Sequence, residues 1–305
     1  MMPEPPLTIG NRINKAIARL QGLREGYAAV LDLVTCGQAA IGPLREFLFA
    51  RNPSGIFQPR CDAVQALAAL GAKDVLLDFL TCPRNVVDPT EQAGEDAVTN
   101  AVARALIKWP DDQLFSLLLE ISQHKLLDGV VEALAEYGRE EAISIFAPAL
   151  GDDFCRPAAE KAFRKIGVSS CPYLLHLAAL RVVISDDIEY DFSRRRRRSA
   201  LRLFAELYYS EDLPEPVRLL VADNDPQVAL LACSICLPRI IPAERKEIAE
   251  RLVILLNSND WMLRTEVEDL LIDYYADCRS VVERNLTLTD DPAAISLRRV
   301  MNQIK

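Results

Sequence analysis

The stretch GREEAISIFAPALGDDFCRPAAEKAFRKIG, residues 138–167, decides the fold of this chain. After its first glycine, apolar side chains such as Ile143 and Phe146 recur at helical spacing. After its acidic loop, small residues such as Ala159 and Ala162 do the same. This periodicity predicts two amphipathic helices that approach each other closely. A glycine just past a helix end is typical of a left-handed cap, so the unit is helix, loop, helix and glycine turn.

The same unit recurs along the chain. Glycine is scarce, with 12 residues in 305, so its recurrence carries information. Gly138 and Gly167 lie 29 residues apart, and Gly37 and Gly71 lie 34 residues apart. Between Gly71 and Gly138, Trp109-Pro110 stands where a degenerate glycine would fall. A period of roughly 30 to 40 residues with two helices per unit is the signature of a helical solenoid.

Three later segments continue the pattern without glycine: RRSALRLFAELY (197–208), ALLACSICLPRI (229–240) and RTEVEDLLIDYY (264–275). We therefore expect an all-α fold of about eight helix pairs and a terminal helix near Pro292 to Gln303. No alternation typical of strands stands out. The stretch from Ser185 to Ser193 is interpreted as an insertion between helices.

The predicted architecture is one right-handed α-α superhelix, a solenoid that runs from residue 1 to residue 305. First helices would form its outer layer, and second helices its inner, concave layer, where such arrays usually bind. Residues 1–10 are expected to be a disordered tail, and residues 278–305 are expected to form C-terminal capping helices.

Composition narrows the function classes. The chain is 50% hydrophobic and 26% charged, which is typical of a globular protein with a sizeable core. Its net charge of −9 argues against duplex nucleic acid as the main partner, since phosphate contacts favour a basic protein. The 8 scattered cysteines indicate reduced thiols. Neither a secretory signal nor an apolar membrane span is recognised, so a cytoplasmic location without a membrane partner is expected.

Residues 138–167 resemble the HEAT-like repeat found in bilin-lyase-type proteins and in many bacterial HEAT proteins. The matching elements are the glycine turn, the alanine-rich second helix, the Asp152-Asp153 loop and Arg156 near the start of that helix. The resemblance extends from Ala28 to Tyr275 and implies a HEAT/ARM-type solenoid. It leaves the function open, because one fold serves many functions.

The most conspicuous charged feature is the run Arg194 to Arg198, with Arg202 after it. On a helix, most of these guanidiniums would cluster opposite the buried stripe, while Arg196 and Arg197 would flank it. One interpretation is a site for an acidic peptide, a phosphate or a nucleic-acid backbone. The alternative is a solvated face neutralised by acids upstream. Those acids are Asp186, Asp187, Glu189 and Asp191.

Other polar features favour structural roles. Arg60, Arg156 and Arg264 share a repeat position. In HEAT-like repeats such an arginine commonly pairs with an acidic loop residue of the same or a neighbouring unit, so the resemblance implies this pairing, with ligand contact as the alternative. Cys233 and Cys236 form a C-x-x-C inside an apolar run, where core packing is expected over redox or zinc chemistry. With only two histidines in the chain, we predict no catalytic residue, no metal site and no cofactor.

The sequence therefore favours a non-enzymatic scaffold or adaptor that binds a protein or peptide partner, with an acidic segment as one option. Two alternatives stay open: a bilin-lyase-like protein that acts as a lyase or chaperone, and a nucleic-acid-binding protein that uses Arg194–Arg198. The residues expected to contact the partner are Arg156, Arg194, Arg195, Arg198, Arg202, Gln227 and Trp261.

Overall fold

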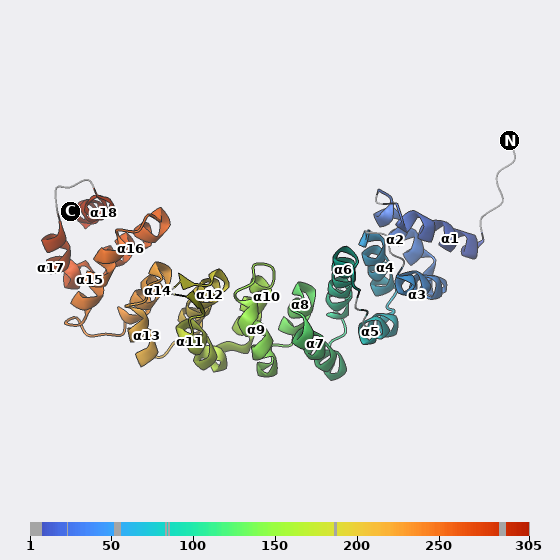
Figure 1. Ribbon diagram of the computed structural model, residues 1–305, viewed down its shortest axis with the longest axis horizontal. Coiled ribbons are helices and arrows are strands. Elements are labelled where there is room, and N and C mark those ends of the chain that lie inside the picture. The colour runs from blue at the N-terminus through green and yellow to red at the C-terminus, as the bar shows by residue number, and fades with distance from the viewer. Residues whose placement is uncertain are drawn as a thin grey trace. The chain divides into compact units, whose positions relative to one another are not determined.

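Helices dominate the computed structural model, which describes residues 8–22, 24–51, 56–82, 84, 86–185, 188–286 and 291–304 (Figure 1). The expected all-α fold is confirmed at this level. The α-helices are α1 (Ile9–Leu20), α2 (Gly26–Thr35), α3 (Ile41–Ala50), α4 (Gln58–Ala69), α5 (Lys73–Thr81), α6 (Pro89–Leu106), α7 (Asp112–His124), α8 (Asp128–Ala135), α9 (Ile143–Ala149), α10 (Arg156–Ile166), α11 (Cys171–Ala179), α12 (Asp191–Leu207), α13 (Glu215–Leu220), α14 (Pro226–Cys236), α15 (Arg245–Leu255), α16 (Trp261–Asp273), α17 (Tyr275–Asn285) and α18 (Pro292–Ile304). Short 3-10 turns η1 (Gly37–Ala40), η2 (Glu140–Ala142) and η3 (Gly167–Ser170) precede α3, α9 and α11.

The chain forms two compact units. Unit 1 comprises Met1–Phe146 together with Pro157–Ala162, and unit 2 comprises Ala147–Arg156 together with Phe163–Lys305. Each unit has its own set of helix contacts. One continuous array over residues 1–305 stays a prediction.

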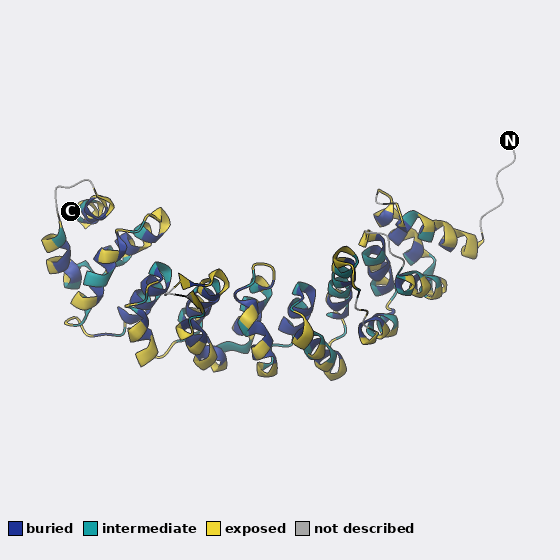
Figure 2. Ribbon diagram, in the orientation of Figure 1, coloured by how far each residue is buried: buried dark blue, intermediate teal, exposed yellow. Residues whose placement is uncertain are grey.

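Within each unit, helices pack in an alternating order. In unit 1, α2, α4, α6 and α8 contact one another in succession, and α3, α5 and α7 each contact the helix that follows. In unit 2, α12, α14, α16 and α18 contact one another in the same way, and α11, α13, α15 and α17 each contact the helix that follows. Buried residues lie on the faces between these helices, and exposed residues cover the other faces (Figure 2).

The glycine turns are confirmed. The glycines with positive φ among the described residues are the four on which the repeat was built, Gly37, Gly71, Gly138 and Gly167, with φ between 61° and 81°. At Gly71 the turn closes the end of α4, because the N–H of Ala72 donates to the carbonyl of Leu67 at 2.9 Å and that of Gly71 to Ala68. This pairing satisfies helix-end carbonyls and needs a residue without a Cβ at the left-handed position.

Acidic loops start several second helices, as expected. A carboxylate oxygen of Asp225 accepts the N–H of Val228 at 3.0 Å at the start of α14, and Asp260 accepts that of Met262 at 3.0 Å at the start of α16. These bonds satisfy N–H groups that have no partner within the helix.

The expectation that the chain has no strand is wrong. A two-stranded antiparallel hairpin, β1 (Val183–Ser185) and β2 (Ile188–Glu189), separates α11 from α12, with Val183 opposite Glu189. The β-branched run Val182-Val183-Ile184 favours extended backbone. This preference is enough for a short strand, although the segment lacks the longer alternation of apolar and polar residues that is typical of strands. The described residues of the segment that we interpreted as an insertion therefore include strand and the start of α12.

Helices lie near both ends of the described chain. Helix α1 begins at Ile9, within the last two residues of the expected disordered tail, and residues 1–7 lie outside the described part of the chain. Helix α18 confirms the terminal helix near Pro292, although its role as a cap stays a prediction.

Replacing two helical glycines of unit 1 by alanine is predicted to have opposite effects on stability. A Cβ on Gly129 in α8 would lie 2.5 Å from the backbone oxygen of Asn100 in α6, whereas a Cβ on Gly42 in α3 would meet nothing within 4 Å. We expect Gly129→Ala to lower the free energy of unfolding by about 1–3 kcal/mol, because rigid backbone must move. Gly42→Ala should raise it by about 0.5 kcal/mol, because alanine restricts the unfolded chain.

Hydrogen exchange of peptides from α6 and α8, together with urea unfolding, measures this difference. An increase in stability for both variants would show that α6 and α8 are not in close contact.

Candidate functional site

The arginine run lies in the first half of α12, next to the end of α11. Arg196 is buried, and its terminal nitrogen donates to the carbonyl of Leu180 at 2.7 Å. The Nε of Arg197 donates to the carbonyl of Ala178 at 2.7 Å. Cations at the C-terminal end of a helix satisfy its last carbonyls and interact favourably with its dipole, so these arginines close α11.

Arg197 is the centre of a buried ionic network. Arg197 is 0% exposed, and its two terminal guanidinium nitrogens donate to Glu189, at 2.8 Å, and to Asp223. Glu189 also accepts the hydroxyl of Ser193 at 2.6 Å, and that hydroxyl accepts the N–H of Val182 at 3.0 Å. The network thus joins the base of the hairpin, α12 and the loop before α14.

Arg198 belongs to the next contact along the helix. Its guanidinium holds both carboxylate oxygens of Asp225, with nitrogen–oxygen distances between 2.5 and 3.1 Å. Because Asp225 is buried and also starts α14 by accepting the N–H of Gln227, Arg198 fixes one helix pair to the next. Arg198 and Gln227, both expected to bind a partner, therefore meet at one carboxylate.

The remaining expected residues are more exposed. Arg194 pairs with Asp191, and the Nε of Arg195 donates to the carbonyl of Gly151 at 3.0 Å. Asp153 lies 2.9 Å from a terminal nitrogen of Arg156 and 3.7 Å from the Nε of Arg195, so it brings these two arginines together.

Arg202 and Trp261 lie farther along the same unit. Arg202 is exposed on α12, where it helps Arg164 to hold the pKa of the Glu206 carboxyl below its usual value; the hydrogen bond from Arg164 is the larger cause. Trp261 is 67% exposed at the start of α16. Neither residue shares a carboxylate partner with Arg194–Arg198 among the described contacts.

The acids expected to neutralise the run do so only in part. Glu189 pairs with Arg197 and Asp191 with Arg194, as the structural alternative predicted. Asp186 and Asp187 lie outside the described residues. Asp223 and Asp225 were not expected as partners of the arginines, although their loop was expected to start a helix.

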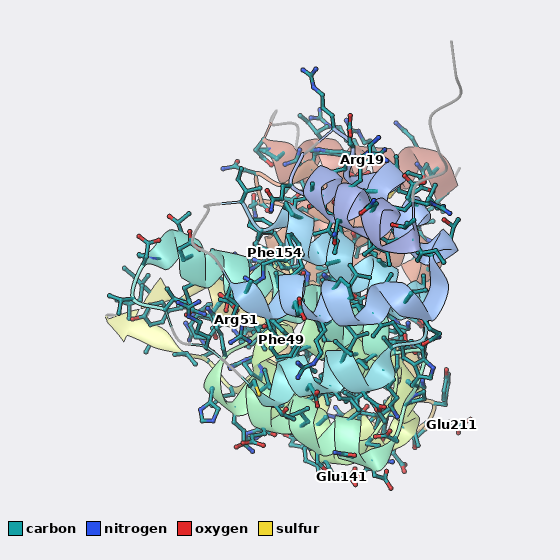
Figure 3. All side chains as sticks on the ribbon, turned by 90° about the vertical axis from the view of Figure 1, so that its right-hand side faces the viewer. Arg19, Phe49, Arg51, Glu141, Phe154 and Glu211 are labelled. Carbon is teal, nitrogen blue, oxygen red and sulfur yellow. The ribbon has the colours of Figure 1, made fainter. Side chains whose placement is uncertain are left out.

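An apolar surface, which we call the hairpin patch, lies beside the arginines. It comprises Val183, Ile184, Ile188, Tyr190 and Phe192, all exposed. The rings of Tyr190 and Phe192 lie with centroids 5.6 Å apart. In Figure 3 the hairpin is drawn as a yellow arrow at the left margin of the molecule.

The loop before α10 packs against the first turn of α12, next to this surface. A Cβ on Gly151 would lie 2.6 Å from the carbonyl oxygen of Phe192, which shows how closely the loop packs on the first turn of α12. Phe154, three residues later in the loop, is 82% exposed.

The hairpin patch was not predicted from the sequence. The signal was present in Val182-Val183-Ile184 and Ile188, two β-branched segments around an acidic pair. This signal was too short to distinguish a hairpin from a loop. The network around Arg197, which holds the hairpin in place, could not be seen in the sequence.

The arginines at the shared repeat position have three different partners. Arg60 pairs with Glu95 of the following second helix at 2.6 Å, and Arg156 pairs with the loop residue Asp153 as predicted. Arg264 instead donates to the carbonyl of Ser258 at 2.5 Å. The expectation of acidic loop partners therefore holds for Arg156 alone.

The C-x-x-C pair is part of the core of α14. Cys233 and Cys236 are buried, and burial raises the pKa of the first thiol to about 12 and that of the second to about 11. A reactive or metal-binding cysteine needs the opposite shift. The packing role that we expected for this pair is therefore supported.

No group of three or more His, Cys, Asp or Glu side chains among the described residues could hold a metal ion. No helix in the same part of the chain combines the length and apolar composition needed to cross a membrane.

The comparisons with known proteins do not assign a family. No family model matches the chain, and no curated protein is significantly similar to it.

Replacing Arg197 tests the buried network. Arg197→Met would leave Glu189 and Asp223 buried without their shared cation, so we expect the free energy of unfolding to fall by about 3–5 kcal/mol. Arg202→Met, an exposed change on the same helix, should alter it by less than about 0.5 kcal/mol.

Urea unfolding followed by circular dichroism compares the two variants. Adding Glu189→Gln and Asp223→Asn to Arg197→Met should recover part of the loss by removing the isolated charges. Equal stability of Arg197→Met and the wild type would contradict the network.

Thiol reactivity tests the core position of the cysteines. At pH 8 a thiol with a pKa near 12 is roughly 0.01% thiolate, so Cys233 should react with Ellman's reagent only after unfolding. The exposed Cys82 should account for a rapid phase in the native protein. Cys82→Ser should remove that phase, whereas a rapid phase that Cys233→Ser removes would show that α14 is exposed.

Proposed function

We propose that this chain is a HEAT-like repeat scaffold that holds a protein partner, and that the hairpin patch is its main contact surface in unit 2. The observation that carries the proposal is an exposed apolar surface fixed in place by a buried ionic network. Apolar patches on a protein surface often mark sites of interaction with other proteins.

The HEAT-like assignment rests on the repeat and its packing. Helices alternate between two rows within each unit, and glycine turns recur at the repeat spacing. Pairs that stack in this way bury a continuous core, and a right-handed superhelix would follow from a constant rotation per pair.

The chemistry of the patch favours a protein over a polyanion. Within the run, Arg197 and Arg198 are engaged by buried carboxylates, and Arg194 is paired with Asp191. Arg195 and Arg196 donate to the carbonyls of Gly151 and Leu180, and the surface that remains is rich in aromatic and aliphatic side chains. Such surfaces are typical of protein interfaces, whereas a nucleic-acid site needs an unbalanced positive strip.

The hairpin also offers backbone groups to a partner. Among the described residues β1 and β2 pair only with each other, so each strand has one edge without a neighbouring strand. An extended partner segment could add to such an edge while its side chains contact Ile184 or Ile188. This arrangement favours an extended peptide with apolar side chains.

A displayed peptide library, panned against the full chain, tests the proposal. The affinity of selected peptides would be measured by fluorescence anisotropy for the wild type and for Ile184→Asp and Ile188→Asp. We expect each substitution to weaken binding by about tenfold or more, because it places a charge in an apolar contact.

Ile254→Asp is the matched control. Ile254 on α15 is 57% exposed in the same unit, against 56% for Ile184, and it lies outside the hairpin patch. It should leave peptide affinity unchanged. Peptides that bind the hairpin variants as tightly as the wild type would refute the assignment of the patch. Salt-dependent affinity for duplex DNA above that for every selected peptide would favour the nucleic-acid alternative.

A further inference from the structure

Three arginines of unit 1 converge where α3 and α5 end and α4 begins. Arg51 follows the last residue of α3, Arg60 lies in the first turn of α4, and Arg84 lies just after α5. The carbonyl of Arg51 accepts a hydrogen bond from Arg84 at 3.0 Å, and Arg51 donates to the carbonyl of Cys82 at 2.7 Å. These two bonds join Arg51 to Cys82 and to Arg84.

One carboxylate serves this cluster. Glu95 of α6 accepts two hydrogen bonds from Arg60, at 2.6 and 3.2 Å, and its Oε2 lies 3.6 Å from the Nε of Arg51. No other ion pair is recorded for Arg51, Arg60 or Arg84 within the described ranges. The cluster therefore carries two positive charges in excess.

The surroundings strengthen the repulsion between these charges. The guanidinium carbon of Arg51 lies 4.8 Å from the ring centroid of Phe79 and 5.9 Å from that of Phe49, and Figure 3 shows Phe49 next to Arg51. Burial lowers the pKa of Arg51, and the charges of Arg60 and Arg84 lower it further against the opposing effect of Glu95. Electrostatic interactions are stronger where water is excluded.

Two further observations show that the cluster is not fully satisfied within the protein. The Nε atoms of Arg51 and Arg60 are buried without a hydrogen-bond acceptor in the part of the chain described. Arg51 is also the non-glycine residue with positive φ there, at 46°. Left-handed backbone disfavours residues with a Cβ, and strain of this kind gathers at ligand sites.

We propose that Arg51, Arg60 and Arg84 bind a phosphate group. A phosphate monoester carries close to two negative charges at neutral pH, which matches the excess charge of the cluster. Its oxygens can accept N–H bonds from guanidiniums on several elements, and arginine is well suited to this recognition. The site lies in unit 1 and is independent of the hairpin patch.

Isothermal titration calorimetry of the full chain with inorganic phosphate, and separately with O-phospho-L-serine, tests the site. Sodium acetate and sodium chloride at equal ionic strength serve as comparison anions. We expect saturable binding of both phosphate probes and none of acetate or chloride. Tighter binding of phosphoserine would indicate a phosphorylated protein as the source, and tighter binding of inorganic phosphate would indicate a free ion.

Arg84→Gln is the decisive variant, because Arg84 is exposed and its loss should not disturb the core. It should weaken phosphate binding by about tenfold, the effect of removing one charged hydrogen-bond donor. Arg45→Gln is the matched control, since Arg45 lies over the ring of Phe49 at 4.8 Å but pairs with Asp78 outside the cluster.

Several results would overturn the proposal. They are the absence of saturable phosphate binding by the wild type, equal binding of acetate and phosphate, and an equal effect of Arg84→Gln and Arg45→Gln. As a second readout, the thermal midpoint of the wild type should rise in phosphate relative to chloride, and this rise should be smaller for Arg84→Gln.

Discussion

A helix pair of this chain cannot bury its own apolar surface. Helix α12 packs against α11 of its own pair and against α14 of the next, and α14 packs in turn against α16. Polar bonds follow the same spacing, since Lys73 of α5 reaches Asp111 at the start of α7 and Arg245 of α15 reaches Asp277 of α17. The free energy of folding is therefore distributed over neighbouring pairs. The loops between helices are where the side chains of one pair bond to the next pair.

This constraint explains why so many arginines lie at helix starts. A second helix such as α12 begins beside the end of α11 and beside the loop before α14, so a long side chain can bond to both. Arg197 does this while fully buried, which is favourable only because two carboxylates and a carbonyl surround it. The position of the hairpin patch follows from this network. Glu189 binds the hairpin to Arg197, while the apolar side chains of the hairpin stay exposed to solvent.

The parts of the structure that depend on local chemistry could be predicted from the sequence. The glycine turns needed only a residue that tolerates positive φ, and the start of α14 at Asp225 needed only a short acidic side chain. The direction of Arg197 could not be predicted, because its partner Asp223 lies 26 residues away and helical spacing places the arginine only at the margin of the stripe. The hairpin was missed for a related reason. Two strands this short have little stability alone, and here the network of Glu189, Ser193 and Arg197 supports them.

The arginine run of α12 and the cluster of Arg51, Arg60 and Arg84 differ in how many carboxylates lie beside their guanidiniums. Arg197 meets the carboxylates of Glu189 and Asp223, so its charge is satisfied within the protein and its role is to join elements. Around Glu95 the ratio is reversed, because Arg51 and Arg60 share one carboxylate and Arg84 adds a third guanidinium. A protein whose total charge is −9 has many acids that could have been placed there. The lack of a second carboxylate at Arg51 is therefore the feature that a bound dianion explains, and it is why we place an anion site in unit 1 and not at the longer arginine run of α12.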